Sequence, residues 1–240
     1  MKKVLAFLLV IACMLSVVAC GSDKALTYAE FMAAELESDV IVEAYVQAKQ
    51  GWWDNKATLY LQDENGGYFA YNATCTQAEY NKIEEGTKVR LAGKKTAWKG
   101  EVELAEGATV TVLSADKWIA PVTDVTSLLG TNDLLAKQNM KVAFKGLTVA
   151  AQKDGDGNDV AFLYNYDGSG AEGSDSDLYF NLTDGEDTYT FVIEYYLTGA
   201  DSDAYKAVQA LNVGDVIDLE GFLYWYNGAQ PHIVSVKPAA

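Results

Sequence analysis

Apolar and polar residues alternate along the first half of the chain. Between residues 40 and 48, valine or alanine occupies every second position, and Glu43, Tyr45 and Gln47 stand between them. A period of two predicts a β-strand. The same reasoning predicts further strands over residues 57–63, 68–73, 87–95 and 101–104, the last with an extension at residues 109–113. Thr76 can cap a short helix that Gly86 ends. The predicted order is therefore three strands, a helix and two strands.

Glycine spacing reveals an internal repeat. Three glycines spaced seven residues apart occur in each half of the chain: Gly86, Gly93 and Gly100, then Gly214, Gly221 and Gly228. Two copies of one fold explain this spacing, because a solenoid needs at least three repeats. We therefore expect one domain over residues 21–120 and a second over 121–240. A short helix is expected before the first strand of each copy, over residues 28–36 and near residues 132–138.

This order of elements is that of the OB-fold, a five-stranded Greek-key barrel. The segments 61–68 and 86–93 resemble OB-fold modules of secreted bacterial proteins, some of which accompany nucleases while others stand alone as lipoproteins. The resemblance covers residues 38–113 well and the second copy more loosely, because the second copy has a long acidic insertion between its first two strands. It implies a mainly β protein with two tandem OB-fold barrels, each preceded by a short helix, and it implies no particular activity.

An apolar segment at the start of the chain ends on Cys20. Lys2 and Lys3 precede sixteen nearly uninterrupted apolar residues, the last of them small. This pattern is typical of a secretory signal, and the run is shorter than the ~20 residues that span a bilayer. Its ending on cysteine resembles the lipobox of bacterial lipoproteins, which implies a signal peptide over residues 1–20 that ends in the lipobox, cleavage just before Cys20, and a lipid such as palmitate on Cys20. We expect a protein anchored by lipid to the extracytoplasmic face of a cell membrane; an uncleaved membrane helix is the alternative.

Charge and composition argue against several functions. The net charge is −16, and residues 121–240 carry eighteen acidic but only six basic side chains. Such a field repels polyanions and disfavours a general nucleic-acid partner. His232 is the only histidine, and no catalytic triad or histidine-based zinc site is evident around it. Glu101 and Glu103 share one strand face and are expected to be solvated. We therefore expect a non-catalytic binding protein that needs no cofactor.

The ligand-binding positions of OB-folds are the face of the second and third strands and the loops that join strands one to two and four to five. Aromatic side chains gather there, where they could stack on a ligand. Including two nearby lysines, the candidate ligand-binding residues are Trp52, Trp53, Tyr60, Tyr68, Tyr71, Lys94, Lys95, Trp98, Trp225 and Tyr226. Because Trp52 and Trp53 are adjacent, we expect one of them to be exposed. An oligosaccharide or a protein is the expected ligand; the alternative is that several of these aromatics fill the barrels or their interface.

Basic residues are concentrated between positions 82 and 99, including Lys94 and Lys95. With Trp98 they could form a groove for single-stranded nucleic acid, which is the first alternative function. The other interpretation is a solvated strand edge whose lysines discourage pairing with further strands.

A possible calcium loop begins at Asp154. Asp156 and Asn158 follow at the expected spacing, but the sixth position is Asp159 instead of glycine and the twelfth is Asn165 instead of glutamate. A Ca²⁺-dependent adhesion or scaffold protein is therefore the second alternative. A flexible hairpin loop explains the same residues without a metal.

Overall fold

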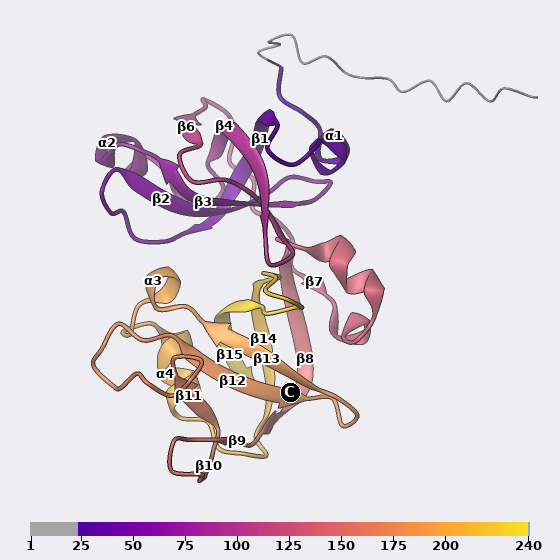
Figure 1. Ribbon diagram of the computed structural model, residues 1–240, viewed down its shortest axis with the longest axis vertical. Coiled ribbons are helices and arrows are strands. Elements are labelled where there is room, and N and C mark those ends of the chain that lie inside the picture. Colours follow the sequence, from indigo (N-terminus) through magenta and orange to yellow (C-terminus); the bar gives the residue numbers. More distant parts are fainter. Residues whose placement is uncertain (1–23, 240) are drawn as a thin grey trace, which may run out of the picture.

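The computed structural model describes residues 24–239, which form two β-barrels, one above the other in Figure 1. The predicted signal and Cys20 lie outside the described residues. Within residues 24–239, no helix combines the length and the apolar character that crossing a bilayer would require. The two barrels follow each other in sequence, and the chain is mainly β.

The first barrel has the strand order predicted from the alternation. Its strands are β1 (Asp39–Lys49), β2 (Lys56–Gln62), β3 (Gly67–Thr74), β4 (Lys88–Trp98), β5 (Glu101–Leu104) and β6 (Thr109–Val112). Helix α1 (Tyr28–Ala33) precedes β1, and α2 (Gln77–Tyr80) lies between β3 and β4. β1 pairs with both β2 and β4, and β3 pairs in parallel with β5 and β6. These pairings close the sheet on itself, as the OB-fold requires.

The second barrel repeats this arrangement. Its principal strands are β8 (Lys141–Ala150), β12 (Leu178–Thr183), β13 (Thr188–Ile193), β14 (Val216–Phe222) and β15 (His232–Pro238). β8 pairs with β12 and β14, and β13 pairs in parallel with β15. Helices α3 (Tyr195–Thr198) and α4 (Asp203–Gln209) occupy the position that α2 has in the first barrel. The insertion after β8 contains β9 (Gln152–Lys153), β10 (Asp159–Val160) and β11 (Phe162–Tyr164).

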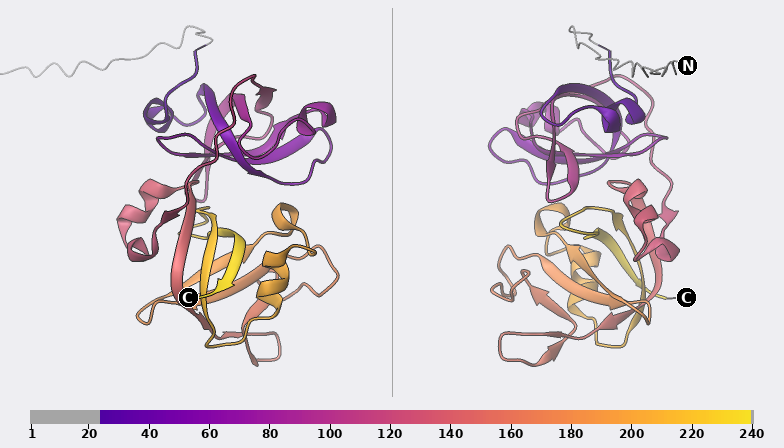
Figure 2. Two further views of the ribbon diagram at one scale, coloured as in Figure 1. Left: turned by 180° about the vertical axis from the view of Figure 1, so that it is seen from behind. Right: turned by 45° about the vertical axis from the view of Figure 1, so that its right-hand side comes forward.

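The segment between the barrels contains short elements. They are β7 (Thr123–Asp124) and the 3₁₀ helices η1 (Thr126–Leu128) and η2 (Asn132–Lys137). β7 pairs with β8, so the chain joins the second barrel soon after Ala120. The expected helix near residues 132–138 is present as η2, and the helix expected over residues 28–36 ends earlier, at Ala33. Figure 2 shows this segment to one side, close to where the barrels meet.

The repeated glycines have the same structural roles in both barrels. Gly86 and Gly214 have φ angles of 81° and 95° just before β4 and β14, a conformation that glycine adopts without steric cost. Gly93 and Gly221 lie within those two strands. An added Cβ at Gly93 would collide with Ala108, and one at Gly221 with the backbone of His232. The sequence repeat therefore records backbone geometry that both barrels need.

Each barrel has its own hydrophobic core. Leu59, Leu61 and Leu91 are fully buried in the first, and Phe144, Phe180 and Phe191 are among the buried residues of the second. Burial of aromatic and aliphatic side chains on this scale is the main stabilising contribution in a domain of this size. Both barrels thus have a core of their own and meet at an additional interface.

Candidate ligand site at the barrel junction

The outer face of β2 and β3, where OB-folds usually bind ligands, is covered in the first barrel. Tyr60 and Phe69 stand opposite each other on these strands and are only 1% and 3% exposed. Phe222 of the second barrel packs against Tyr60, with ring centroids 4.8 Å apart. The three rings form a hydrophobic cluster of their own, separate from either barrel core. The first barrel therefore uses this face to dock the second.

A buried polar network fixes the same interface. The Tyr60 hydroxyl donates to Glu194 Oε2 over 2.7 Å and lies 2.7 Å from His232 Nδ1. Gln50 Nε2 donates to Glu194 Oε1 over 2.7 Å. Burial raises the pKa of Glu194, but His232, Tyr60 and Gln50 stabilise its carboxylate, and the net effect lowers that pKa. Four side chains from both barrels thus satisfy one another, which specifies a single relative orientation.

Beside this interface lies a pocket of about 420 Å³, which we call the junction pocket. Its lining residues are Tyr71 of β3, Thr96, Ala97 and Trp98 of β4, Glu103 of β5, and Tyr224, which follows β14. Tyr71 and Trp98 are 46% and 57% exposed, so their rings are accessible from solvent. Both barrels contribute to the pocket.

Glu103 is the charged residue that lines the junction pocket, and it is only 7% exposed. Within residues 24–239 its carboxyl group has no hydrogen bond or ion pair, and its oxygens are open to the pocket, whereas Glu101 Oε1 is fully enclosed. Burial raises its pKa to about 7. The expectation that Glu103 and its neighbour Glu101 are solvated is wrong, because the second barrel covers this face of β5.

Glu101 lies two residues before Glu103 on the same strand face and is fully buried. Its Oε2 accepts a hydrogen bond from the backbone N–H of Trp225 over 2.9 Å, and its Oε1 has no partner in the described part of the chain. Burial raises the pKa of Glu101 to about 8. Two carboxyl groups that can be protonated near neutral pH therefore sit side by side at the junction.

Three of the predicted ligand-binding residues are buried and are removed from the candidate surface. Tyr60 lies in the interface, and Tyr68 is inside the first barrel, where its hydroxyl donates to Asp63. Lys95 is 4% exposed, and its Nζ donates to the carbonyl oxygens of Met32 and Ala34 over 2.8 Å each. Lys95 thus satisfies carbonyl groups at the end of α1 and is not a surface lysine.

Four of the predicted residues meet at or near the junction. Tyr71 and Trp98 line the pocket. Trp225 packs closely on Gly100, where an added Cβ would lie 2.7 Å from the indole ring. Tyr226 follows it and is 43% exposed. No sequence pattern indicated Tyr224 or Glu103 as residues of this site, because they come together only when the barrels dock.

The remaining candidates lie elsewhere. Trp52 is half-buried and donates from Nε1 to the carbonyl oxygen of Cys75 over 2.8 Å, whereas Trp53 is 67% exposed. This confirms that one member of the pair is exposed, but neither lines the junction pocket. Lys94 is exposed, and its Nζ donates to the carbonyl oxygen of Glu37 over 3.0 Å.

The basic strand β4 is largely neutralised by acidic neighbours on β1. Glu43 contacts Lys88 at 3.1 Å and Arg90 at 2.6 Å. Lys94 lies 3.5 Å from Asp39. With Lys95 buried as well, β4 does not present the continuous positive groove that binding a nucleic-acid backbone requires.

The predicted calcium loop folds as a hairpin between β9 and β10. The Asp154 carboxylate accepts hydrogen bonds from the backbone N–H groups of Asp156 and Asn158 over 2.9 and 2.8 Å. Asn158 Nδ2 donates to the same carboxylate over 3.1 Å. Among residues 24–239, no three His, Cys, Asp or Glu side chains are grouped closely enough to hold a metal ion. The Asp154 carboxylate therefore holds the backbone of its own loop.

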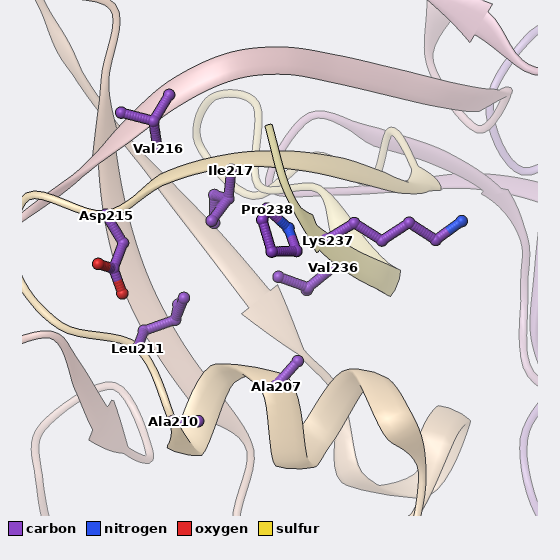
Figure 3. Close-up of a pocket in the computed structure, with 9 residues that line it drawn as sticks. All are labelled: Ala207, Ala210, Leu211, Asp215, Val216, Ile217, Val236, Lys237 and Pro238. Atoms are coloured by element: carbon purple, nitrogen blue, oxygen red, sulfur yellow. The ribbon is translucent and has the colours of Figure 1, made fainter. Parts of the chain in front are cut away.

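A second pocket, of about 390 Å³, lies between α4 and the strands β14 and β15 (Figure 3). Ala207, Ala210 and Leu211 line one side of it, and Ile217 and Val236 are among the residues on the other. Asp215 and Lys237 are its charged lining residues. Its apolar surface offers few groups that would orient a specific ligand.

Comparisons with known proteins give no family. No protein-family model and no curated protein matches the sequence. Among solved structures, an aspartyl-tRNA synthetase from Entamoeba histolytica aligns with a TM-score of 0.33 and 20% identity over 41% of this chain. This chain covers 23% of that synthetase.

Two further structures align over most of the chain. A murine DNA-binding protein bound with double-stranded DNA has a TM-score of 0.35 and 10% identity, over 85% of this chain and all 100% of its own. The p202 HIN1 domain in complex with a 12-mer double-stranded DNA has a TM-score of 0.33 and 14% identity, over 85% of this chain and 94% of its own. Similarities at this level carry no argument about the ligand, so the site must be interpreted from its own geometry.

Proposed function

We propose that this chain is a non-catalytic binding protein, anchored by lipid on Cys20 to the extracytoplasmic face of a cell membrane, and that it captures an oligosaccharide in the junction pocket. The pattern around Cys20 supports the anchor. A Cys20→Ser variant tests it, and we expect this variant to move from the membrane fraction to the soluble fraction and to incorporate no labelled fatty acid. Unchanged membrane association would contradict the anchor.

The observation that carries the ligand proposal is the aromatic wall of the junction pocket. Tyr71 and Trp98 of the first barrel and Tyr224 of the second face one cavity, and two of these rings are about half exposed. Aromatic rings bury the apolar C–H faces of a sugar ring, and a few polar groups then fix its orientation. Glu103 supplies carboxyl oxygens to the same cavity, and Thr96 Oγ1, which donates its proton to Glu37 Oε1 over 3.0 Å, can still accept a hydrogen bond.

The rigidity of the junction supports the same function. Tyr71, Trp98 and Glu103 stand on barrel strands, and Tyr224 stacks on His232 with centroids 4.2 Å apart. A site held by strands and a packed interface is preorganised, which reduces the entropy lost when a ligand binds. The charge of −16 and the ion pairs along β4 favour a ligand that is not a polyanion.

The test compares two exposed tryptophans in a soluble form that begins at residue 21, which retains every described residue. A glycan and oligonucleotide array identifies the ligand, and calorimetry measures its affinity. We expect Trp98→Ala to weaken glycan binding by roughly tenfold or more, which corresponds to the ~1.4 kcal/mol or more that a stacked ring contributes. Trp53→Ala is the matched control, because Trp53 is at least as accessible as Trp98 but lies outside the pocket.

Two outcomes would contradict the proposal. If no glycan binds, or if Trp53→Ala weakens glycan binding as much as Trp98→Ala, the junction pocket is not the oligosaccharide site. If oligonucleotides bind instead, with an affinity that falls steeply as salt rises, the single-stranded nucleic-acid alternative is correct.

A further inference from the structure

The junction pocket contains a buried acid, Glu103. Stacking of a neutral sugar on the aromatic rings would not require a carboxyl group there. Glu103 is 93% shielded from solvent, lines the cavity, and has no hydrogen-bonding or charged partner in the described protein. Glu101, behind it on the same strand face, has an orphaned Oε1. A buried carboxyl group without a partner is destabilising, whether it is ionised or left without its hydrogen bonds. Of the two, Glu103 lines the pocket, so it is the acid that a ligand there could pair with.

We propose that the junction pocket binds an organic ammonium group, which packs against the faces of Trp98, Tyr71 and Tyr224 and pairs with the carboxylate of Glu103. The inference rests on the proposed function for the location of the site, and it deepens that function by naming the charge of the ligand. An oligosaccharide that contains amino sugars has both the ring faces and the ammonium group that this pocket fits.

The arrangement of rings around an acid is suited to a cation. Cations are attracted to the negative faces of aromatic rings, and several rings in one desolvated site strengthen that attraction. The Lys99 ammonium already lies 5.8 Å from the centroid of the Trp98 ring, within the range of such an interaction. A second, bound ammonium would complete the pair with Glu103 that the protein itself does not provide.

The charged and titratable surroundings of the pocket are mainly acidic. Glu101 stands beside Glu103 on β5. His232, on which Tyr224 stacks, has its Nδ1 3.3 Å from Glu194 Oε2. Tyr71 and Tyr224 are the titratable wall residues, and burial raises the pKa of Tyr224. Lys99 is the basic neighbour, at the solvent side of the Trp98 hairpin. The excess of carboxyl groups favours a positive ligand at neutral pH.

This chemistry predicts a pH dependence that comes from the protein alone. Burial raises the pKa of Glu103 to about 7, so its ionised fraction grows between pH 6 and pH 8. A cation binds the ionised form, and its affinity should therefore rise over that interval. Choline is the suitable probe because its quaternary ammonium group carries no proton that titrates. We expect its affinity to increase by about fivefold to tenfold from pH 6 to pH 8, in line with the ionisation of one group near pH 7.

The decisive experiment compares a glucosamine tetramer with an N-acetylglucosamine tetramer by calorimetry at pH 7. The two share their sugar rings, and the acetyl groups of the second replace ammonium groups by uncharged amides. We expect the glucosamine tetramer to bind at least tenfold more tightly, and we expect Glu103→Gln to abolish that preference. Tyr71→Leu, on the exposed rim, is a second variant and should weaken both choline and the glucosamine tetramer. Trp53→Ala should change neither.

Each outcome separates this inference from the proposed function. Equal binding of both tetramers, with loss in Trp98→Ala, would overturn the ammonium site and leave the oligosaccharide site standing. Binding of choline without either tetramer would support the ammonium site, and the glycan array would then decide whether another oligosaccharide binds. Failure of choline and both tetramers would overturn the ammonium site, and the proposed function would then be decided by the glycan array. A glucosamine preference that persists in Glu103→Gln would also overturn the ammonium site at Glu103.

Discussion

The two barrels build the same β-hairpin but use its outer face differently. In the first barrel, Asp63 accepts hydrogen bonds from two backbone N–H groups of the turn and from the Tyr68 hydroxyl at 3.0 Å. In the second, Asp184 also accepts two backbone hydrogen bonds and one from the Tyr189 hydroxyl at 3.1 Å. These aspartates therefore mark equivalent positions in β2–β3 and β12–β13.

When the two hairpins are aligned on these aspartates, they differ in the residue pair that faces outward from the barrel. The outward pair is Tyr60 and Phe69 in the first barrel and Asn181 and Thr190 in the second. The aromatic pair is buried against Phe222, whereas Thr190 Oγ1 donates to Asn181 Oδ1 over 2.9 Å on a partly exposed face. One cross-strand pair thus distinguishes a face that docks another barrel from a face that stays accessible to solvent.

The largest effect is expected when the outward pair of the first barrel is replaced by the outward pair of the second. In the double variant Tyr60→Asn with Phe69→Thr, the interface loses two buried rings and the hydroxyl that donates to Glu194. We expect this change to cost roughly 4–7 kcal/mol of interface stability, from lost burial and from a buried carboxylate left without a donor. The barrels should then unfold in separate transitions, measurable by chemical denaturation and by an expanded shape in small-angle scattering.

The control for that experiment is a change at the equivalent pair of the second barrel. Thr190→Val removes one partly exposed hydrogen bond and should cost about 1 kcal/mol or less, without changing the number of transitions. If the double variant retained one cooperative transition at an unchanged midpoint, the aromatic pair would not be what joins the barrels.

Glu101 provides a second test, because it is an acid of the first barrel that the second barrel buries. Its pKa is about 8 in the folded protein, against an ordinary value near 4.5. Between these values the unfolded chain releases the proton while the folded chain keeps it, so the free energy of unfolding should fall as pH rises from 4.5 to 8. The full effect is on the order of 4 kcal/mol at pH 8 and absent below pH 4.5.

Glu101→Gln should remove this dependence. The amide oxygen of glutamine can still accept the hydrogen bond from the Trp225 N–H, so the variant should match the parent near pH 4.5 and exceed its stability by a few kcal/mol at pH 8. Denaturation curves at a series of pH values measure the difference. Glu106→Gln, at an exposed position, is the control and should shift the curve by about 0.5 kcal/mol or less. Parallel curves for Glu101→Gln and the parent would show that Glu101 is ionised when folded.

Local patterns in the sequence were sufficient to predict the barrels. Alternation over residues 40–48 predicted β1, and the glycine spacing predicted the duplication, because both depend on backbone geometry within one barrel. The coverage of an outer strand face depends on a partner far away in the sequence. Tyr60 and Glu101 therefore have the sequence pattern of solvent-facing strand residues, although the second barrel buries both.

Lys95 is a single-residue example of a contact that a local sequence pattern does not predict. Its position in a basic stretch indicated a surface cation, but its Nζ reaches the carbonyl groups of Met32 and Ala34, more than 60 residues earlier. Only part of the junction pocket was predicted, for a similar reason. Tyr71 and Trp98 occupy the positions that OB-folds use for ligands, whereas Tyr224 reaches them only through the docking of the second barrel.

The two hairpin aspartates allow the finest comparison, because the same hydrogen bond is buried in one barrel and exposed in the other. Tyr68 is fully buried, and burial next to Asp63 raises the pKa of its hydroxyl, whereas Tyr189 is partly exposed. Asp63→Ala leaves the Tyr68 hydroxyl without an acceptor and should cost about 2–3 kcal/mol; Asp184→Ala should cost about 1 kcal/mol, since water can replace the carboxylate.

Double-mutant cycles with Tyr68→Phe and Tyr189→Phe isolate the two hydrogen bonds from the backbone contacts that each aspartate also makes. We expect a coupling energy of about 1–2 kcal/mol between Asp63 and Tyr68, and about 0.5 kcal/mol or less between Asp184 and Tyr189. Equal coupling energies would mean that burial in the first barrel does not strengthen this bond. The hairpins would then be energetically alike, and the difference between the barrels would reside entirely in the outward pair.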